Sequence, residues 1–279
     1  MDAGPRPLAS MTALQDFAAR HRRLFVLTGA GISTDSGIPG YRDDAGQWRK
    51  APPVMLQDFL ASAASRRRYW ARSMHGWPLV GRAQPNAGHA ALARLERARR
   101  VVRTVTQNVD GLHQRAGSAD VVELHGSVGR VVCLQCRTLC AREDVQRALE
   151  AANPGFAGAG ATVAPDGDAD VTWPDLDAFV VPECAHCGGM LKPDVVFFGE
   201  GVPRVRVDAA RAALDAADAM LVVGSSLMVW SGYRFCEAAH AAGKPIAAIN
   251  RGRTRADHLF EVKVEDSCGA ALAALADGT

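Results

Sequence analysis

Short apolar segments recur along this chain, and each ends at a cluster of polar residues or glycines. Segments with helical periodicity separate many of them, for example at residues 208–217 and 233–242. Continuous apolar runs are typical of strands buried on both faces, and strands that alternate with helices predict an open parallel sheet. The expected strands are residues 24–28, 101–105, 121–124, 194–198, 219–224 and 245–250.

The polar clusters indicate where a ligand would bind. Residues 106–110, 125–127 and 225–226 each follow an expected strand directly. In an open parallel sheet, ligands bind outside the carboxyl ends of the strands. We therefore predict an α/β fold with a Rossmann-like open parallel sheet, helices on both faces, and a ligand site at that edge. Further helices are expected at 11–22 and 85–97, and one or two helices at 53–74.

Net charge and hydropathy exclude several classes of partner. The 279 residues carry a net charge of +2, which gives no general attraction to nucleic acid or to an anionic membrane. No apolar run approaches the roughly 20 residues that span a bilayer, and the first ten residues lack the apolar region of a secretion signal. We therefore expect no nucleic-acid partner, no membrane association, a cytoplasmic location and a monomer.

Four of the seven cysteines form two Cys-x-x-Cys pairs, Cys133 with Cys136 and Cys184 with Cys187. Four thiolates are the ligand set of a tetrahedral structural zinc site, and the short spacing lets both sulfurs of a pair face one ion. Such a site has no open coordination position, so we predict one zinc ion that supports folding in a small zinc-ribbon module. The odd cysteine count also favours a reducing compartment over a disulfide framework.

The segment after the first expected strand has the features of a dinucleotide-binding loop, with one departure. Gly29 and Gly31 allow the backbone to turn sharply and to approach a pyrophosphate closely. Thr34 stands where a third glycine is usual. In a dehydrogenase, an acidic residue at the end of the next strand binds ribose hydroxyls, and this chain has no clear counterpart of it. Residues 35–39 extend the loop, which can cover the far end of a ligand.

Three polar residues at strand ends are candidates for chemistry. Histidine titrates near neutral pH, which makes His125 the best general-base candidate. Asp110 can accept a hydrogen bond from an amide, and Asn108 can orient water or a ribose hydroxyl. Both residues could equally serve as a turn or a helix cap.

Several motifs, in order along most of the chain, resemble those of the sirtuins, which are NAD-dependent protein-lysine deacylases. They are GAGISTDSGIPGYR, TQNVDGLH, LHGS, the two cysteine pairs, LKPDVVFFGE, GSSL and the IN of PIAAIN. The motifs RYWAR, GWP, QPN, APDGD and SGYRF are similar to those of class II, which includes the mitochondrial lipoamidase-type sirtuin of animals. That class also has a long insertion between its cysteine pairs, as residues 137–183 form here.

The resemblance implies roles for individual residues. The general base would be His125, with Asn108 beside it at the nicotinamide ribose. Ile38 and Asp110 would hold the nicotinamide amide. The remaining NAD contacts would come from Gly29, Ala30, Gly31, Ser33, Tyr41, Arg42, Gln107, Gly224, Ser225, Ser226, Asn250, Arg251 and Cys268. The backbone of an acyl-lysine peptide would pair as a strand with Val195, Phe197, Gly199 and Glu200.

The implied reaction consumes NAD as a co-substrate and yields deacylated lysine, nicotinamide and O-acyl-ADP-ribose. Tyr69 and Arg72 lie three residues apart, so on a helix they share one face. A similarly placed pair binds the acyl carboxylate in sirtuins that remove acidic acyl groups, and an arginine fork suits a carboxylate. We therefore hypothesise that the enzyme prefers acidic or long acyl groups. The alternatives are NAD-dependent mono-ADP-ribosyl transfer to protein and a zinc-ribbon binding module with a vestigial pocket.

The motifs divide the chain into three parts. Residues 1–45, 84–128 and 192–279 are expected to form a discontinuous Rossmann-like NAD-binding domain. Residues 46–83 are expected to form a helical module. Residues 129–191 are expected to form the zinc-binding module, with its insertion at 137–183, of which residues 153–170 are predicted to be a long loop.

Overall fold

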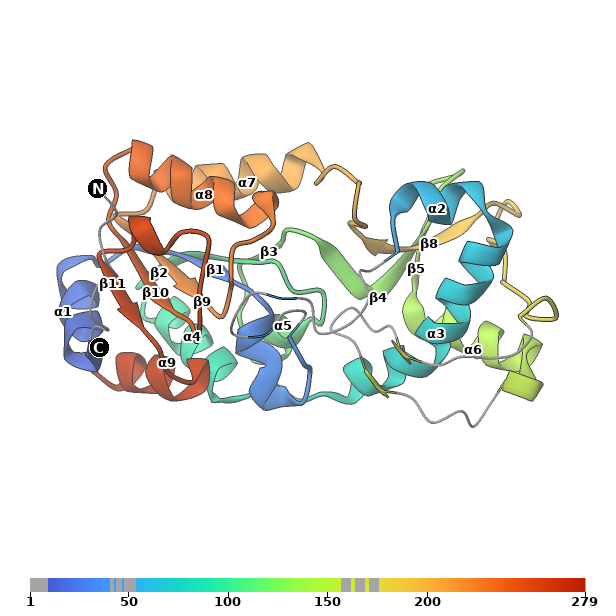
Figure 1. Ribbon diagram of the computed structural model, residues 1–279, viewed down its shortest axis with the longest axis horizontal. Coiled ribbons are helices and arrows are strands. Elements are labelled where there is room, and N and C mark those ends of the chain that lie inside the picture. Colours follow the sequence, from blue (N-terminus) through green and yellow to red (C-terminus); the bar gives the residue numbers. More distant parts are fainter. Residues whose placement is uncertain are drawn as a thin grey trace.

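Six parallel strands form the sheet of the larger lobe, on the left in Figure 1. The computed structural model describes residues 10–40, 43, 47, 54–156, 162–163, 169–170 and 176–278. The strands are β1 (Leu24–Thr28), β2 (Val101–Thr106), β3 (Val121–Glu123), β9 (Ala219–Val223), β10 (Ile246–Ile249) and β11 (Val262–Val264). Their spatial order is β3-β2-β1-β9-β10-β11, the order of the dinucleotide-binding fold, with its switch point between β1 and β9.

Alternate residues of β1 enter two different hydrophobic cores. Leu24 and Val26 face the helices α1 (Met11–Arg20), α4 (Ala87–Arg97) and α9 (Cys268–Asp277). Phe25 and Leu27 face α7 (Arg204–Asp215) and α8 (Trp230–Ala241) on the other side of the sheet. Complete burial of such a side chain contributes about 1.5–3 kcal/mol. The predicted parallel sheet with helices on both faces is confirmed.

The smaller lobe contains an antiparallel sheet, covered by helices (Figure 1). The strands lie in the order β5 (Leu139–Ala141), β4 (Gly126–Cys133) and β8 (Leu191–Val195). Trp70 and Leu149 pack with Val131 and Leu191 of the sheet in one core. The other elements are α2 (Leu56–Ala61), α3 (Ala63–Arg82), α5 (Leu112–Arg115), α6 (Arg142–Ala152), the two-residue strands β6 (Thr162–Val163) and β7 (Ala169–Asp170), and the 3-10 helices η1 (Ala30–Ser36), η2 (Pro154–Phe156) and η3 (Asp257–Leu259).

The strand expected at 194–198 is real but does not belong to the parallel sheet. Its counterpart β8 pairs antiparallel with β4, with Val195 opposite Gly126 and Pro193 opposite Val131. An apolar run indicates burial but not the direction of the neighbouring strand, so the sequence assigned it to the wrong sheet. Pro193 is tolerated because β8 is an edge strand.

One or two helices were expected at 53–74; the structure has two, α2 and α3, and the second continues through a proline to Arg82. Pro78 lies inside α3, where it cannot donate the usual hydrogen bond to the carbonyl of Met74. The side chain of Gln146 on α6 donates to that carbonyl at 2.8 Å. A long-range contact therefore satisfies the group that the proline leaves unpaired, which no local pattern predicts.

Some elements were not expected from the sequence. The strands β4 and β11 and the helices α6 and α9 were missed, as were two small segments in the expected loop at 153–170, η2 and the β6–β7 pair. The helices at 87–97, 204–215 and 230–241 agree with expectation to within a few residues. Among the described residues, no helix is both long enough and apolar enough to cross a membrane.

Candidate functional site

Three glycines bring two loops into backbone contact at the switch point of the sheet. The N–H of Gly29 donates to the carbonyl of Val223 at 3.0 Å, and the N–H of Gly31 donates to that of Gly224 at 2.8 Å. A Cβ atom on Gly31 would lie 2.8 Å from the Gly224 Cα, and one on Gly224 would lie 2.4 Å from the Ile32 nitrogen. Gly224 also has φ +60°, a conformation that favours glycine. No larger residue fits this crossing.

The segment after Gly29 forms a 3-10 helix, η1, in place of the usual α-helix. Thr34 occupies the place of the third glycine, and its hydroxyl donates to the Gly31 carbonyl at 2.9 Å. Gly37 ends the element with φ +83°. The Thr34 side chain therefore braces the loop, and the close backbone packing comes from Gly224, directly after the neighbouring strand β9.

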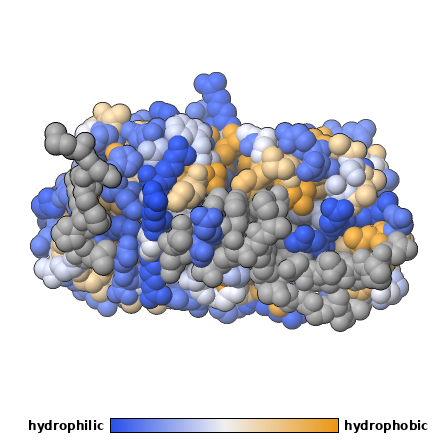
Figure 2. All heavy atoms as spheres, viewed as in Figure 1, coloured by the Kyte–Doolittle hydropathy of each residue, from blue (hydrophilic) through white to orange (hydrophobic). Residues whose placement is uncertain are grey.

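A cavity of about 750 Å³ opens at the carboxyl ends of β1, β2 and β9 and reaches the smaller lobe. This volume lies in the usual range for a bound cofactor or ligand. In the view of Figure 2, apolar surface gathers near the middle of the molecule, between the two lobes. The predicted site residues that line the cavity are Gly29, Ala30, Gly31, Gln107, Asn108, His125, Val195, Phe197, Gly199, Glu200, Gly224, Ser225, Ser226, Asn250, Arg251 and Cys268.

Five other predicted contacts, all among the described residues, do not form part of the cavity wall. Ser33 and Asp110 lie behind it, and Ile38 packs in a core cluster with Val109 and Leu112. The pair on α3, Tyr69 and Arg72, also lies outside the lining. Tyr41 and Arg42 lie outside the described residues.

Asn108, Ser33 and Asp110 form one hydrogen-bonded unit at the end of β2. The Asn108 amide donates to the Gly29 carbonyl at 3.0 Å and to the Ser33 hydroxyl at 3.1 Å. The Ser33 hydroxyl donates to Asp110 at 2.7 Å, and the Leu112 N–H donates to the other carboxylate oxygen at 2.9 Å. Burial raises the pKa of Asp110 above its usual value, although these hydrogen bonds oppose that effect. The unit ties the glycine loop to β2.

His125 lines the cavity in a defined tautomer. Its Nδ1 lies 2.9 Å from the carbonyl oxygen of Gln107, which can only accept, so Nδ1 carries the proton. Nε2 therefore has a free electron pair, which accepts from the Ser231 hydroxyl at 2.7 Å. Burial lowers the pKa of His125 to about 4, and the charges of Arg234 and Arg206 act in the same direction. At neutral pH the ring is uncharged and can accept a proton at Nε2.

An ion pair between the buried Lys192 and the partly buried Glu200 shapes the cavity wall after β8. Glu200 accepts from the N–H of Phe197 at 2.8 Å and from the ammonium of Lys192 at 2.9 Å. Lys192 is 3% exposed, donates to the Val195 carbonyl and lies 4.5 Å from the Phe197 ring centroid. These contacts hold residues 195–200 as a bent, extended segment at the cavity.

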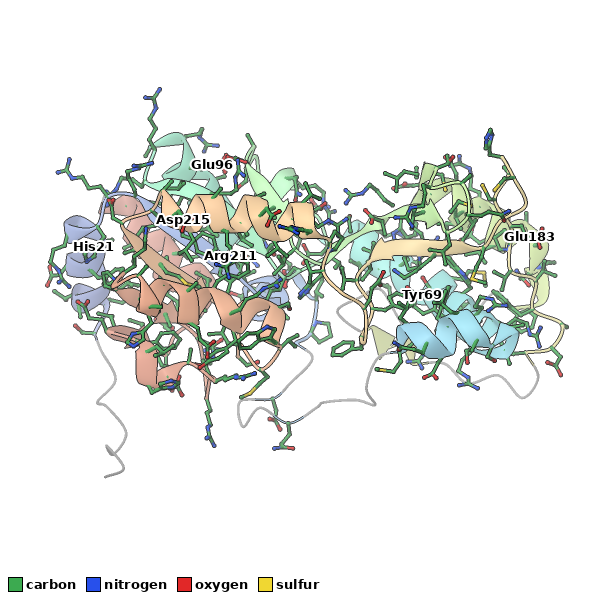
Figure 3. All side chains as sticks on the ribbon, turned by 90° about the horizontal axis from the view of Figure 1, so that it is seen from above. His21, Tyr69, Glu96, Glu183, Arg211 and Asp215 are labelled. Carbon is green, nitrogen blue, oxygen red and sulfur yellow. The ribbon has the colours of Figure 1, made fainter. Side chains whose placement is uncertain are left out.

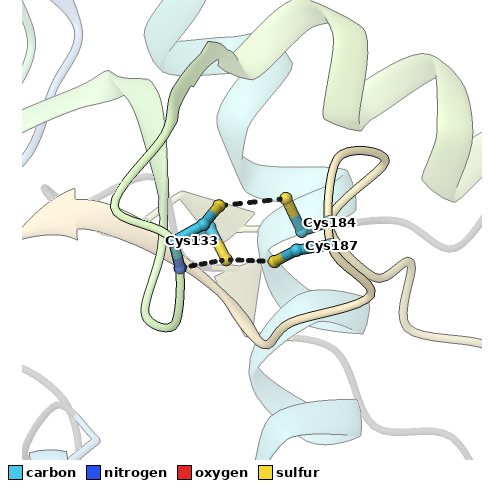
Figure 4. Close-up of side chains that lie close together, drawn as sticks. Cys133, Cys184 and Cys187 are labelled. Carbon is cyan, nitrogen blue, oxygen red and sulfur yellow. Dashed lines mark hydrogen bonds between the residues drawn. The ribbon is translucent and has the colours of Figure 1, made fainter.

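The four paired cysteines meet at one point of the smaller lobe (Figure 4). Their sulfur atoms all lie within 4.8 Å of one another, and no histidine, including His186, belongs to this cluster of described residues. The pKa of Cys136 is lowered to about 6, mainly because its sulfur forms a hydrogen bond with the Thr138 hydroxyl. Gly188 turns the second pair with φ +71°. Four converging thiols on two tight turns fit one structural zinc ion.

Comparison with known proteins identifies the family. A model of the Sir2 family matches residues 29–231. A protein of Xanthomonas campestris pv. campestris, named an NAD-dependent protein deacetylase, is 59% identical over 263 residues, which cover 94% of this chain and 90% of the relative. A protein of Bordetella bronchiseptica with the same name is 56% identical over 266 residues, covering 95% and 97%. The chain belongs to the Sir2 family, the sirtuins.

A solved structure shares the fold of this sirtuin over nearly the whole length of both chains. The structure described as Sir2–p53 peptide–NAD+ superposes with a TM-score of 0.76 at 29% identity, covering 95% of this chain and 96% of that one. NAD is the cosubstrate of the family, and the residues present fit it. The backbone approach at Gly31 and Gly224 leaves N–H groups and small side chains at the switch point, where a pyrophosphate binds in this type of fold.

The sequence missed three residues of the sirtuin site. Ser231 contacts the catalytic candidate His125, Arg234 lines the same cavity, and Lys192 braces its wall. All three lie inside motifs that carried the family resemblance, SGYRF and LKPDVVFFGE. The motifs were a signal for the site, but only the spatial contacts assign these residues to it.

Proposed function

We propose that this sirtuin is an NAD-dependent protein-lysine deacetylase in which His125 is the general base. The observation that carries the proposal is the neutral His125 ring, whose Nε2 is unprotonated, and this residue lines the cavity that begins at the glycine crossing. The relatives that are 56–59% identical over nearly the whole chain carry the same activity in their names. A histidine in this position contributes on the order of 10²–10⁴-fold to rate.

The roles proposed for the remaining residues are those that the family resemblance implies. When bound, NAD supplies an electrophilic ribose carbon that the acyl oxygen of the substrate attacks as nicotinamide leaves. The Nε2 atom of His125 accepts the proton of a ribose hydroxyl, once the Ser231 hydroxyl no longer donates to that nitrogen. Asn108 holds the ribose side, and Asp110 with Ile38 receives the nicotinamide amide once the η1 loop has adjusted around it.

The partner in this proposal is an acylated lysine of a protein or peptide. Residues 195–200 offer an extended backbone that lines the cavity, with Val195, Phe197, Gly199 and Glu200 along it. A peptide that adds to such a segment pairs through main-chain hydrogen bonds, so the sequence of the peptide matters less than its extended shape. A solved Sir2 relative is described with a p53 peptide.

The acyl specificity is a finer part of the proposal. We propose a class II, lipoamidase-like sirtuin on the basis of the class II motifs and the long insertion, and a preference for acidic or long acyl groups on the basis of Tyr69 and Arg72. Figure 3 places Tyr69 in the smaller lobe, where its ring lies 5.2 Å from that of Phe197. Phe197 lines the cavity, and Tyr69 lies directly behind Phe197. A long acyl chain would therefore contact Tyr69 only after the Phe197 side chain has moved.

The three-part division of the chain, the cytoplasmic location and the monomeric state also remain parts of the proposal. Four thiolate ligands for zinc require a reducing compartment, which supports the location.

An acyl-peptide panel with NAD, followed by mass spectrometry, tests the function. We expect release of nicotinamide that depends on the acyl peptide, with O-acyl-ADP-ribose as product and a loss of at least a hundredfold in His125→Ala. Unchanged turnover in His125→Ala would refute its role. Nicotinamide release without an acyl peptide, with label left on protein, would instead indicate ADP-ribosyl transfer. Acetyl turnover faster than glutaryl, succinyl and lipoyl, and unchanged in Arg72→Ala, would remove the acyl hypothesis.

A further inference from the structure

Arg234 is an arginine of the cavity wall that has no carboxylate partner among the described residues. It lies on α8, one turn after Ser231, and its Nε donates to the Ser231 carbonyl at 3.1 Å. Its Nη2 is buried and has no hydrogen-bond partner in the described part of the chain. A buried donor that stays unpaired costs about 1–3 kcal/mol, and more when it is charged, so the position calls for an external acceptor.

Neighbouring arginines show what a paired side chain looks like in this molecule. Arg206 pairs with Asp194 at 3.1 Å, and Arg130 pairs with both Asp194 and Glu123. Glu200, which lines the cavity with Arg234, is already bound to Lys192. Glu237 lies three residues after Arg234 on α8, but it interacts with Tyr233. Glu200 and Glu237 thus each have another partner.

One face of α8 presents this unpaired charge to the reaction site. Trp230, Ser231 and Arg234 all line the cavity, and Arg234 lies four residues after Trp230 and three after Ser231, so it neighbours each of them on the helix surface. Trp230 is 53% exposed, so the face is open to solvent at its beginning. Ser231 connects the face directly to His125 through its hydroxyl.

We propose that Arg234 binds a carboxylate of the substrate, beside His125, and selects acyl-lysine substrates that carry one. The proposal rests on the proposed deacylase function. The carboxylate can come from an acidic acyl chain or from an Asp or Glu side chain next to the acyl-lysine. In either case, a guanidinium with an unused N–H gains a charge-assisted hydrogen bond, the strongest class that such a group forms. The charges of Arg234 and Arg206 both act on His125, but of these two arginines only Arg206 has a carboxylate partner, Asp194, among the described residues.

The test uses three peptides of one sequence and NAD at saturation. The first has acetyl-lysine between two Gln residues, the second replaces one Gln by Glu, and the third keeps both Gln but carries glutaryl-lysine. We expect the kcat/KM of one carboxylate peptide to exceed that of the neutral peptide about tenfold, which equals ~1.4 kcal/mol. The peptide that shows the preference identifies the source of the carboxylate.

Two variants assign the preference to Arg234. In Arg234→Met, which keeps an unbranched stem, the ratio between the carboxylate and neutral peptides should fall to about one. The matched control is Arg211→Met on α7, where Figure 3 labels this exposed residue. Arg211 repels Arg234 electrostatically but does not line the cavity, so its variant should keep the wild-type ratio. Arg234→Lys keeps the charge without the fork and should retain part of the preference.

The outcomes separate this proposal from the one on which it rests. A wild-type protein without preference for either carboxylate peptide, or a preference that survives Arg234→Met, overturns the role of Arg234. A preference for glutaryl-lysine that is lost in Arg72→Ala but kept in Arg234→Met assigns the carboxylate to α3 instead. Failure to release nicotinamide with any of the three peptides overturns the deacylase function itself.

Discussion

The N–H of Gly31 and the carbonyl of Gly224 form a 2.8 Å hydrogen bond that joins the loops after β1 and β9. The two residues lie far apart in the chain, yet their backbones touch because neither has a side chain. In a sheet of this order, β1 and β9 are neighbours at the switch point, where the crevice for a dinucleotide opens. This contact therefore places the two loops that frame the NAD end of the cavity.

Gly224→Ala should destabilise the protein and weaken NAD binding together. The new Cβ would lie 2.4 Å from the Ile32 nitrogen, and the residue would keep φ +60°. Overpacking and a left-handed backbone together cost about 2–4 kcal/mol. Urea unfolding measures the loss of stability, and calorimetry with NAD measures the affinity.

Gly37→Ala is the matched control for that variant. Gly37 has a similar φ of +83°, but a Cβ there meets no atom within 4 Å. Only the conformational strain of about 1–2 kcal/mol remains. Equal losses in the two variants would show that the crossing itself contributes nothing.

Lys192→Met should loosen the cavity wall and raise the KM for the peptide more than that for NAD. The variant leaves Glu200 partly buried without its ammonium partner, which costs about 2–3 kcal/mol. Steady-state kinetics with each substrate varied in turn would measure the split.

The double variant Lys192→Met, Glu200→Gln checks the cause. It removes the unpaired charge, so it should be more stable than Lys192→Met alone. If the double variant is as unstable as the sum of the two single variants, the ion pair is not the reason for the effect.

Cys136→Ser should remove the metal and lower the thermal stability of the smaller lobe. The Cys136 sulfur lies 3.8 Å from that of Cys184, in the cluster that fits zinc. Structural zinc sites contribute directly to folding free energy. Metal content by mass spectrometry and melting by circular dichroism, with and without a chelator, measure both effects.

Cys140→Ser provides the comparison, because Cys140 lies close in sequence but outside the cluster. It should retain one zinc ion per chain. A wild-type protein whose melting temperature is the same before and after chelation would contradict the structural role of the metal.

Stability should fall as the pH drops from about 6.5 toward 4, because two buried histidines resist protonation. Burial lowers the pKa of His89 to about 4 and that of His113 to about 3, and their rings lie 4.9 Å apart. The unfolded chain takes up protons near pH 6.5 while the folded one does not, so acid favours unfolding. Each group should contribute a loss on the order of 2 kcal/mol between pH 7 and 5.

Urea unfolding at several pH values, compared with His113→Gln, measures this effect. The variant removes one of the two groups, so its stability should change less between pH 7 and 5 than that of the wild type, whatever its stability at pH 7. Parallel pH curves for the two proteins would show that His113 does not resist protonation in the folded state.

The sequence determined the local elements and the chemistry that they carry. Apolar runs identified five of the six strands of the large sheet, all except β11, because a strand buried on both faces must be apolar along its length. The spacing of Cys133 with Cys136, and of Cys184 with Cys187, predicted the metal ligands, since two residues between them allow both sulfurs to face one point. Gly29 and Gly31 indicated the dinucleotide loop, because only glycine permits that approach.

Only the tertiary structure decided which of these elements meet. The apolar run near residue 195 could have joined either sheet, and its pairing with β4 settled the matter. Three hydrogen bonds join residues far apart in the chain. Gly31 donates to Gly224, Ser231 donates to His125, and Gln146 donates to the Met74 carbonyl that Pro78 leaves unpaired. Local patterns report burial and backbone conformation, whereas the partner of a polar group depends on how the packed elements are arranged in space.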